Sequence, residues 1–217
     1  MILASNSPRR RQLLALSGWD FSVQPADVDE HVLPGETPAA YVLRLAQDKV
    51  LRGVESSPGG DIVLAADTAV VDADAILGKP SSPDEAIAML QGLRGHTHQV
   101  YTGIAVCRGQ AGEPVTDLCV TDVPMRSYAD EEIQAYVASG DPLDKAGAYG
   151  IQHPGFQPVE KPGGCFASVM GLPLCHVERS LRRLGLTPAA DIPKNCQDSL
   201  DYRCPVWRDI QTSEPRG

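Results

Sequence analysis

Apolar residues along the chain follow two different periods, which predicts a fold of interleaved strands and helices. Four segments are continuously apolar or alternate between apolar and polar residues, as strands do. Asp67 and Thr68 interrupt one of these segments, and a polar loop over 108–114 joins two others like a hairpin. Strands are therefore expected at residues 1–4, 62–71, 97–107 and 116–126.

Five further segments have apolar residues at helical spacing and carry the signals of helix ends. Three begin with a hydroxyl residue before Pro, namely Ser7-Pro8, Thr37-Pro38 and Ser82-Pro83. The hydroxyl is expected to cap the helix, and Pro fits its first turn. Glu85 completes a capping box with Ser82. Helices are expected from Pro8 to Gly18, Thr37 to Gly53, Ser82 to Gly95, Asp130 to Ser139 and Pro173 to Gly185.

This order of elements, with hairpin-like strand pairs, indicates a mixed α/β fold rather than a repeat of parallel units. We expect a mixed sheet with flanking helices. The length of 217 residues fits one compact domain of one or two lobes. Helical periodicity ends at Gly185, so the domain is expected over 1–185. Residues 186–217 are then a Pro-rich tail that packs on the surface or stays mobile.

The composition matches an ordinary globular protein, with 42% hydrophobic and 22% charged residues. The 19 Lys and Arg residues against 28 Asp and Glu give a net charge of −9, which disfavours binding to nucleic acid or anionic lipid. No segment approaches the ~20 apolar residues that span a bilayer. The N-terminus also lacks the basic and apolar regions of a signal peptide. We therefore expect a cytoplasmic protein that binds neither membranes nor nucleic acid.

The six cysteines form no Cys-x-x-Cys pair, and we expect them to be reduced thiols, as in cytosolic proteins. Cys196 and Cys204 lie near each other in the tail. A local disulfide or a metal site is the alternative for this pair.

Familiar cofactor and catalytic motifs do not occur in the sequence. It contains no Gly-x-x-x-x-Gly-Lys-Ser/Thr, no Gly-x-Gly-x-x-Gly after a strand and no Gly-x-Ser-x-Gly. His96 and His98 lack the i, i+4 spacing of a zinc protease. ATPase, dehydrogenase and serine hydrolase functions are therefore disfavoured.

Several cations stand where an anion would stabilise them. Arg9 and Arg10 lie in the first turn of a predicted helix, where the helix dipole disfavours cations unless an anion such as phosphate binds. A solvated basic face is the alternative. Lys79, between Gly78 and Pro80, lies in a rigid loop before a predicted helix.

Two carboxylates and one further lysine complete this set. Asp67 interrupts an apolar run, so it must be paired, metal-bound or functional, unless it caps a turn through Thr68. Lys49 continues the inward stripe of its helix, although it could instead extend its ammonium to the surface. Glu30 lies in an acidic loop. Several cations with one or two carboxylates suggest a triphosphate with a divalent metal.

Eight segments, in order along residues 1–185, resemble the Maf family of nucleoside triphosphate pyrophosphatases. They are Leu3–Arg10, Asp27–Glu30, Leu45–Lys49, Ala66–Val70, Gly78–Pro80, Gly95–Gly103, Asp144–Gln152 and Gly171–Leu174. The resemblance implies an elongated α/β fold like that of inosine triphosphate pyrophosphatases, with two lobes around a cleft. It also implies a homodimer that hydrolyses a nucleoside triphosphate to the monophosphate and pyrophosphate.

The resemblance further implies roles for individual residues. Asp67 matches the family's proton acceptor, which activates water. Glu30 and Asp67 are expected to bind a divalent cation, Mg²⁺ or alternatively Mn²⁺, which would lower the pKa of water and bridge the phosphates. The phosphate-facing positions are Ser5, Arg9, Arg10, Lys49 and Lys79.

Three residues, Arg9, Thr68 and Gln152, match the dTTP/UTP branch of the family rather than the branch that prefers 7-methyl-GTP. A pocket distinguishes one methyl group by only ~1–3 kcal/mol, so both dTTP and UTP are expected as substrates. The segments His153–Pro158 and Cys165–Met170 depart from the family pattern. Another nucleotide such as 7-methyl-GTP is therefore an alternative substrate. A non-catalytic regulator of cell division or a nucleic-acid-binding protein is the alternative function.

Overall fold

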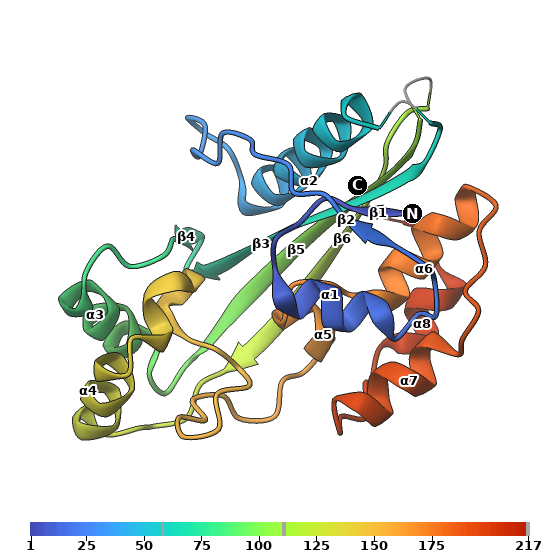
Figure 1. Cartoon of the computed structure of the whole chain (residues 1–217). Helices are drawn as coiled ribbons and strands as arrows, with labels where there is room; N and C mark the ends of the chain where they lie inside the picture. Colours follow the sequence, from blue (N-terminus) through green and yellow to red (C-terminus); the bar gives the residue numbers. More distant parts are fainter. Residues whose placement is uncertain (58, 110–111, 216–217) are drawn as a thin grey trace. The chain divides into compact units, whose positions relative to one another are not determined.

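The structure is a computed structural model that describes residues 1–57, 59–109 and 112–215 (Figure 1). The chain divides into two compact units. Unit 1 consists of residues 1–68, 101–120 and 164–217, and unit 2 of residues 69–100 and 121–163. The long strands contribute residues to both units.

Within the described residues, one six-stranded sheet has the order β2-β1-β3-β5-β6, and β4 pairs with β3. β1 pairs in parallel with both neighbours, placing Ile2 opposite Ser22 and Val63. β4 pairs antiparallel with the end of β3. The predicted mixed sheet with flanking helices is thus confirmed. The strands are β1 Ile2–Leu3, β2 Ser22–Val23, β3 Ile62–Asp72, β4 Ala75–Leu77, β5 Thr97–Arg108 and β6 Val115–Pro124.

The helices of unit 1 are α1 Pro8–Ala15, α2 Pro38–Glu55, α5 Phe166–Val169, α6 Leu174–Arg183, α7 Ile192–Ser199 and α8 Trp207–Thr212. The apolar face of α2 packs on the sheet, where Ala46, Val50 and Val54 join one buried cluster with Val63 of β3. A Cβ at Gly103 of β5 would lie 2.5 Å from a main-chain oxygen of α2. Only glycine therefore allows this close approach of β5 and α2.

Unit 2 contains α3 Pro83–Leu93, α4 Asp130–Ala138 and two short 3₁₀ helices, η1 Asp141–Asp144 and η2 Ala146–Ala148. Leu90 and Ile133 are fully buried between these elements. The atypical segment after Gln152 is anchored here, because Phe156 is 2% exposed and its ring stacks on Tyr136 with centroids 4.4 Å apart.

The predicted helix caps are present, with one difference. Ser7 and Thr37 accept hydrogen bonds from the main-chain N–H groups of Arg10 and Ala40. Ser82 likewise accepts from Glu85 N at 3.2 Å. The carboxylate of Glu85, however, binds the main-chain N–H and hydroxyl of Ser81. The capping box is therefore only half formed.

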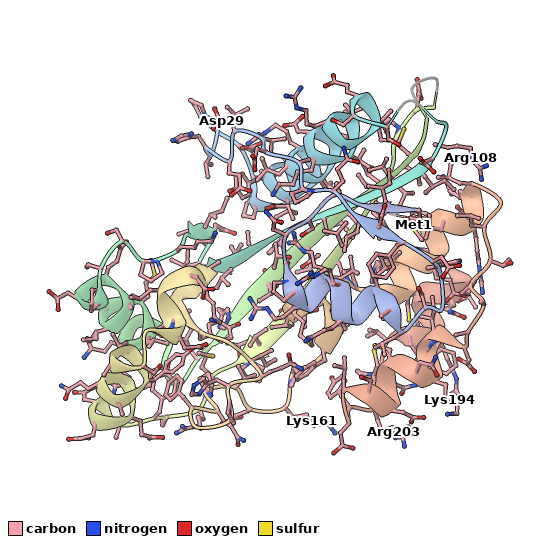
Figure 2. The ribbon with its side chains drawn as sticks, in the orientation of Figure 1. Met1, Asp29, Arg108, Lys161, Lys194 and Arg203 are labelled. Carbon is pink, nitrogen blue, oxygen red and sulfur yellow. The ribbon has the colours of Figure 1, made fainter. Side chains whose placement is uncertain are left out.

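The C-terminal segment, residues 186–217, contains two helices, although its lack of helical periodicity predicted none. α7 and α8 pack against α6, and Arg179 of α6 forms a buried ion pair with Asp117 of β6 at 2.7 Å. Arg179 also donates to Ile210 O at 3.1 Å, which holds α8 in place. Figure 2 labels Lys194 and Arg203, two exposed basic residues of this segment. The domain boundary at residue 185 stays a prediction.

Five other elements were not predicted from the sequence. They are β2, β4, α5 and the two 3₁₀ helices, none longer than four residues. Among the described residues, none of the helices combines the length and the apolar character needed to cross a membrane.

Candidate active site

The centre of β3 and the inward face of α2 supply two buried charged residues of unit 1. Asp67 interrupts the apolar residues of β3 and is 7% exposed. Lys49 follows Val42 and Ala46 along the buried stripe of α2 and is 8% exposed. The prediction that Lys49 lies on the inward face of its helix is thus confirmed.

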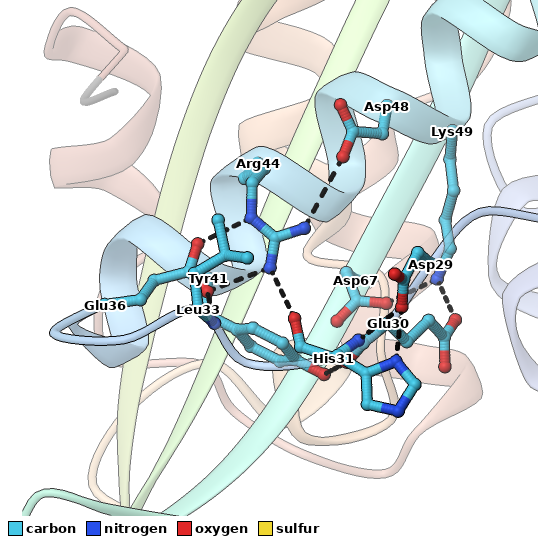
Figure 3. Close-up of polar contacts among 10 residues, drawn as sticks. All are labelled: Asp29, Glu30, His31, Leu33, Glu36, Tyr41, Arg44, Asp48, Lys49 and Asp67. Atoms are coloured by element: carbon cyan, nitrogen blue, oxygen red, sulfur yellow. Dashed lines mark hydrogen bonds and ion pairs between the residues drawn. The ribbon is translucent and has the colours of Figure 1, made fainter.

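The ammonium group of Lys49 joins two carboxylates. Its Nζ atom donates to Asp67 Oδ1 and to Glu30 Oε1, each at 2.6 Å (Figure 3). Glu30 is the outer member of this group, with a side chain that is 54% exposed. Asp67 therefore has the partner that a buried carboxylate requires, and the turn-capping alternative is not needed to explain it.

The acidic loop that carries Glu30 is held against α2 by two side chains of that helix. Tyr41 donates its hydroxyl to Glu30 O at 2.9 Å. Arg44 donates to His31 O at 3.0 Å and forms a bidentate pair with Glu36 (Figure 3). These contacts fix the main chain at Glu30 and His31, and the Glu30 carboxylate accepts from Lys49.

Arg10, in the first turn of α1, is oriented by three hydrogen bonds. Its Nε donates to Gly171 O at 2.9 Å, Nη1 to Ser5 Oγ at 3.2 Å and Nη2 to Thr68 Oγ1 at 3.3 Å. The hydroxyl of Thr68 lies 3.0 Å from that of Thr102. The guanidinium is therefore fixed beside β3 by residues from three parts of the sequence.

Electrostatic coupling joins Arg10 to the Lys49 group. Burial raises the pKa of Asp67, and the positive charges of Lys49 and Arg10 oppose this shift without cancelling it. Burial likewise lowers the pKa of Arg10, opposed by the charges of Asp67 and Glu30. Burial also raises the pKa of Tyr41 to about 12, so its hydroxyl stays a donor to the Glu30 loop. Two cations and two carboxylates thus form one electrostatically balanced group.

The structure brings together most of the residues that the sequence predicted for a site. Arg9 neighbours Arg10 on α1 and is partly buried. Lys79 and Gln152 belong to unit 2, where both are exposed. The predicted residues that unit 1 gathers through hydrogen bonds or charge coupling are Ser5, Arg10, Glu30, Lys49, Asp67 and Thr68.

Four supporting residues were not singled out from the sequence. Tyr41 and Arg44 lie on the face of α2 that meets the acidic loop, and neither residue belongs to a recognised sequence motif. Thr102 is buried within β5, where its hydroxyl donates to Ser168 O at 2.9 Å. Gly171 has a φ of 104°. A Cβ there would lie 3.3 Å from Arg10 Nε, so its glycine keeps the carbonyl accessible to the guanidinium.

The donor set suits a hard cation that shares its ligands with a bound phosphate. Glu30 and Asp67 supply carboxylate oxygens, the ligand type that Mg²⁺ prefers. No group of three or more His, Cys, Asp or Glu side chains among the described residues is arranged to hold a metal ion. Because Mg²⁺ is usually bound by one or two carboxylates together with substrate phosphates, two carboxylates beside Arg10 fit this mode.

Comparison with known proteins identifies the family. A family profile described as Maf-like protein matches residues 1–184. The chain belongs to the Maf family.

Three relatives of this Maf protein share one description. The dTTP/UTP pyrophosphatase of Anaeromyxobacter dehalogenans (strain 2CP-1) is 48% identical over 187 residues, covering 85% of this chain and 94% of the relative. The dTTP/UTP pyrophosphatase of Photorhabdus laumondii is 47% identical, covering 84% and 93%. That of Dehalococcoides mccartyi is 43% identical over 209 residues, covering 96% and 92%. The last match is long enough to include part of the C-terminal segment. A solved dITP/XTP pyrophosphatase from Mycobacterium abscessus is 20% identical over 57% of this chain and 71% of its own, with a TM-score of 0.37.

Proposed function

We propose that this Maf protein hydrolyses dTTP and UTP to the nucleoside monophosphate and pyrophosphate. The observation that carries the proposal is the group of Lys49, Glu30 and Asp67 beside the fixed guanidinium of Arg10. Relatives at 43–48% identity are described as dTTP/UTP pyrophosphatases. Hydrolysis of nucleotides that are in excess or modified would remove them from the nucleotide pool.

In the reaction, a water oxygen attacks the α-phosphorus and the bond to the oxygen bridging the α and β phosphates breaks. Asp67 accepts the proton of the attacking water. Its burial supports this role, because a raised pKa makes the carboxylate a stronger base. Arg10, Arg9, Lys49, Lys79 and the hydroxyl of Ser5 bind phosphate oxygens, and cations so placed stabilise the charge of the transition state.

A divalent cation, Mg²⁺ or alternatively Mn²⁺, would bind to Glu30 and Asp67. When bound, it supplies charge neutralisation for the phosphates and lowers the pKa of the attacking water. Lys49 holds the two carboxylates at one place before the cation arrives, since its Nζ contacts both at 2.6 Å. Such preorganisation reduces the rearrangement that binding requires.

Substrate preference is assigned to Arg9, Thr68 and Gln152. The hydroxyl of Thr68 contacts Arg10, so its influence on specificity passes through the position of that guanidinium. Gln152 carries an amide that both donates and accepts, as the edges of uracil and thymine require. The protein is further proposed to be a cytoplasmic homodimer, the commonest closed assembly. With a net charge of −9, it is not expected to bind nucleic acid or anionic membranes.

Product analysis tests the proposal. The full chain is incubated with dTTP, UTP, CTP, GTP or 7-methyl-GTP, with Mg²⁺ or with a chelator, and pyrophosphate is measured separately from phosphate. Pyrophosphate formed mainly from dTTP and UTP, and only with the metal, is the expected result. Pyrophosphate formed mainly from another nucleotide would refute the substrate assignment but retain the reaction. No turnover of any nucleotide would refute the enzymatic function and favour a regulatory binding protein.

A further inference from the structure

The C-terminal segment brings Cys204 against the segment that leads into α5. The hydroxyl of Tyr202 donates to Gly164 O at 2.9 Å, and Cys204 Sγ lies 4.0 Å from the same oxygen. The rings of Tyr202 and Phe166 also pack together, with centroids 5.4 Å apart. On its other side, Cys204 N donates to Gln197 Oε1 of α7 at 3.2 Å. Cys204 is thus fixed next to Cys165, the residue that follows Gly164.

Two thiol–thiol contacts that share Cys165 join three cysteines at this place into a sulfur row. The thiol of Cys165 is in hydrogen-bonding contact with Cys204 on one side and with Cys119 of β6 on the other. Cys119 and Cys165 are 5% and 6% exposed. Cys204 is the partly exposed end of the row. All three residues belong to unit 1. A reagent from solvent therefore meets Cys204 first.

The environment of Cys204 favours its reactive form. The hydrogen bond from Cys165, helped by the N–H groups of Val206 and Trp207, lowers the pKa of Cys204 to about 7. Since the thiolate is the nucleophile, this shift increases the reactive share of Cys204 at neutral pH. Cys196 has similar exposure in the same segment, but burial raises its pKa to about 12. Cys204 is the more reactive of these two thiols, and its hydrogen-bonding contact with Cys165 makes Cys165 the partner within reach.

We propose that Cys204 and Cys165 are a reversible oxidation site, at which a peroxide converts the two thiols into a disulfide. The Cys204 sulfur attacks one peroxide oxygen, the O–O bond breaks, and Cys204 becomes a sulfenic acid as hydroxide leaves and takes up a proton. The Cys165 sulfur then attacks the Cys204 sulfur, displacing the hydroxyl group as water and forming the S–S bond. The thiols lose two electrons and two protons, and hydrogen peroxide becomes two water molecules.

The disulfide would connect the start of α5 in unit 1 to the segment between α7 and α8. Cys165 directly precedes α5, and the chain continues from α5 to Gly171, the acceptor of Arg10. Cys119 would be a second partner for Cys165, because thiol–disulfide exchange requires only contact between a thiolate and a disulfide sulfur. The sulfur row therefore contains one partly exposed thiol, Cys204, that meets the oxidant, and one buried thiol, Cys119, that can exchange with the disulfide.

A zinc site is the competing use of these residues. Cys119, Cys165 and Cys204 are zinc-ligand types, and the side chain of His176 contacts Cys119. The described part of the chain nevertheless contains no three such side chains arranged around a common metal position. Pairwise contacts along a row suit the formation of a disulfide bond.

Mass spectrometry of the full chain tests the proposal. The protein is reduced, freed of reductant, treated with hydrogen peroxide and alkylated before and after reduction. We expect a mass lower by about 2 Da before alkylation, two fewer alkylated thiols, a Cys165–Cys204 peptide link, and reversal by dithiothreitol. In Cys165→Ser, sulfenic acid should persist on Cys204 and be trapped by dimedone.

Cys204→Ser and Cys196→Ser form the matched pair of variants, since both positions are partly exposed in the C-terminal segment. Cys204→Ser cannot form this disulfide and should keep both alkylatable thiols, Cys165 and Cys119, after peroxide treatment, whereas Cys196→Ser should leave the rate of disulfide formation unchanged. A Cys196–Cys204 link, oxidation of Cys204 to sulfinic acid with Cys165 present, or no reaction would each overturn the proposal. One equivalent of bound zinc, released by treating the thiols, would overturn it in favour of the metal site.

Discussion

Asp67→Asn separates the chemical role of the buried carboxylate from its structural role. The substitution keeps the size of the side chain and removes its charge and its ability to accept a proton. Lys49 keeps Glu30 as a partner at 2.6 Å, so the ammonium is not left buried without a counter-ion. The asparagine oxygen can still accept a hydrogen bond from Lys49.

The expected effects on turnover and on stability differ greatly in size. Loss of a positioned proton acceptor lowers a rate by about 10²–10⁴-fold, so we expect kcat to fall about 10³-fold, or about 4 kcal/mol. For the free energy of unfolding, an ion-paired hydrogen bond becomes one from the ammonium to a neutral amide oxygen, a loss of about 1 kcal/mol. Removal of the cost of burying the Asp67 charge offsets part of that loss.

The pH dependence of unfolding supplies a second test of the same substitution. Burial raises the pKa of Asp67 in the folded state above its ordinary value of 3.8. The folded protein therefore binds this proton more tightly than the unfolded chain does, and the contribution of Asp67 to stability falls as pH rises from about 3.8 through the raised pKa. The asparagine side chain of the variant does not titrate. The stability of the variant relative to wild type should consequently improve across that pH range.

The assay combines steady-state release of pyrophosphate, nucleotide binding by calorimetry and urea unfolding at several pH values. Asp72→Asn is the control, because Asp72 is also on β3 and its carboxylate pairs with His96 at the surface. This control should retain wild-type kcat. A kcat for Asp67→Asn within about tenfold of wild type would refute Asp67 as the proton acceptor. A stability difference that does not change with pH would refute its raised pKa.

Three further substitutions test the packing and charges of unit 1. Lys49→Met leaves two carboxylates without their shared cation and should lower the free energy of unfolding by about 3 kcal/mol at about pH 8. The loss should be smaller at more acidic pH, because burial raises the pKa of Asp67 and a protonated Asp67 needs no cation. Equal losses at both pH values in urea unfolding would contradict this. Arg179→Met removes the counter-ion of Asp117, which is fully buried, and should lower the free energy of unfolding by about 3–5 kcal/mol. An unchanged urea midpoint would show that the pair is not stabilising. Gly103→Ala places a Cβ 2.5 Å from a main-chain oxygen and should lower the free energy of unfolding by about 1–3 kcal/mol. An equal or higher melting temperature would show that the backbone relaxes freely.

The features that the sequence predicted are those set by local pattern. The stripe of α2 predicted that Lys49 faces inward, because helical period fixes which residues share a face. Ser7 and Thr37 predicted their helix starts, since a cap depends only on the following turn. Asp67 was identified as exceptional because charge is costly within an apolar strand.

The contacts that the sequence did not predict depend on tertiary packing. Glu30 reaches Lys49 only because Tyr41 and Arg44 hold its loop on α2. The helices α7 and α8 are short, and their stability comes from contacts such as that of Arg179 with Ile210 O rather than from periodicity. Proximity in the sequence suggested Cys196 as a partner of Cys204, whereas the fold places Cys204 against Cys165.

Under the proposed function, the site must supply more positive charge than Lys49 and Arg10, which already balance Glu30 and Asp67. Without substrate, Lys49 and Arg10 balance Glu30 and Asp67, so the group is close to neutral. A nucleoside triphosphate carries about four negative charges, and one divalent metal cancels about half of them. The remainder must be met by side chains that have no carboxylate partner in the group. Arg9 beside Arg10, and Lys79 from unit 2, are the residues from which the sequence predicted this contribution. Under the proposed function, the near-neutral charge of this group favours a nucleotide that carries a divalent metal over the free nucleotide.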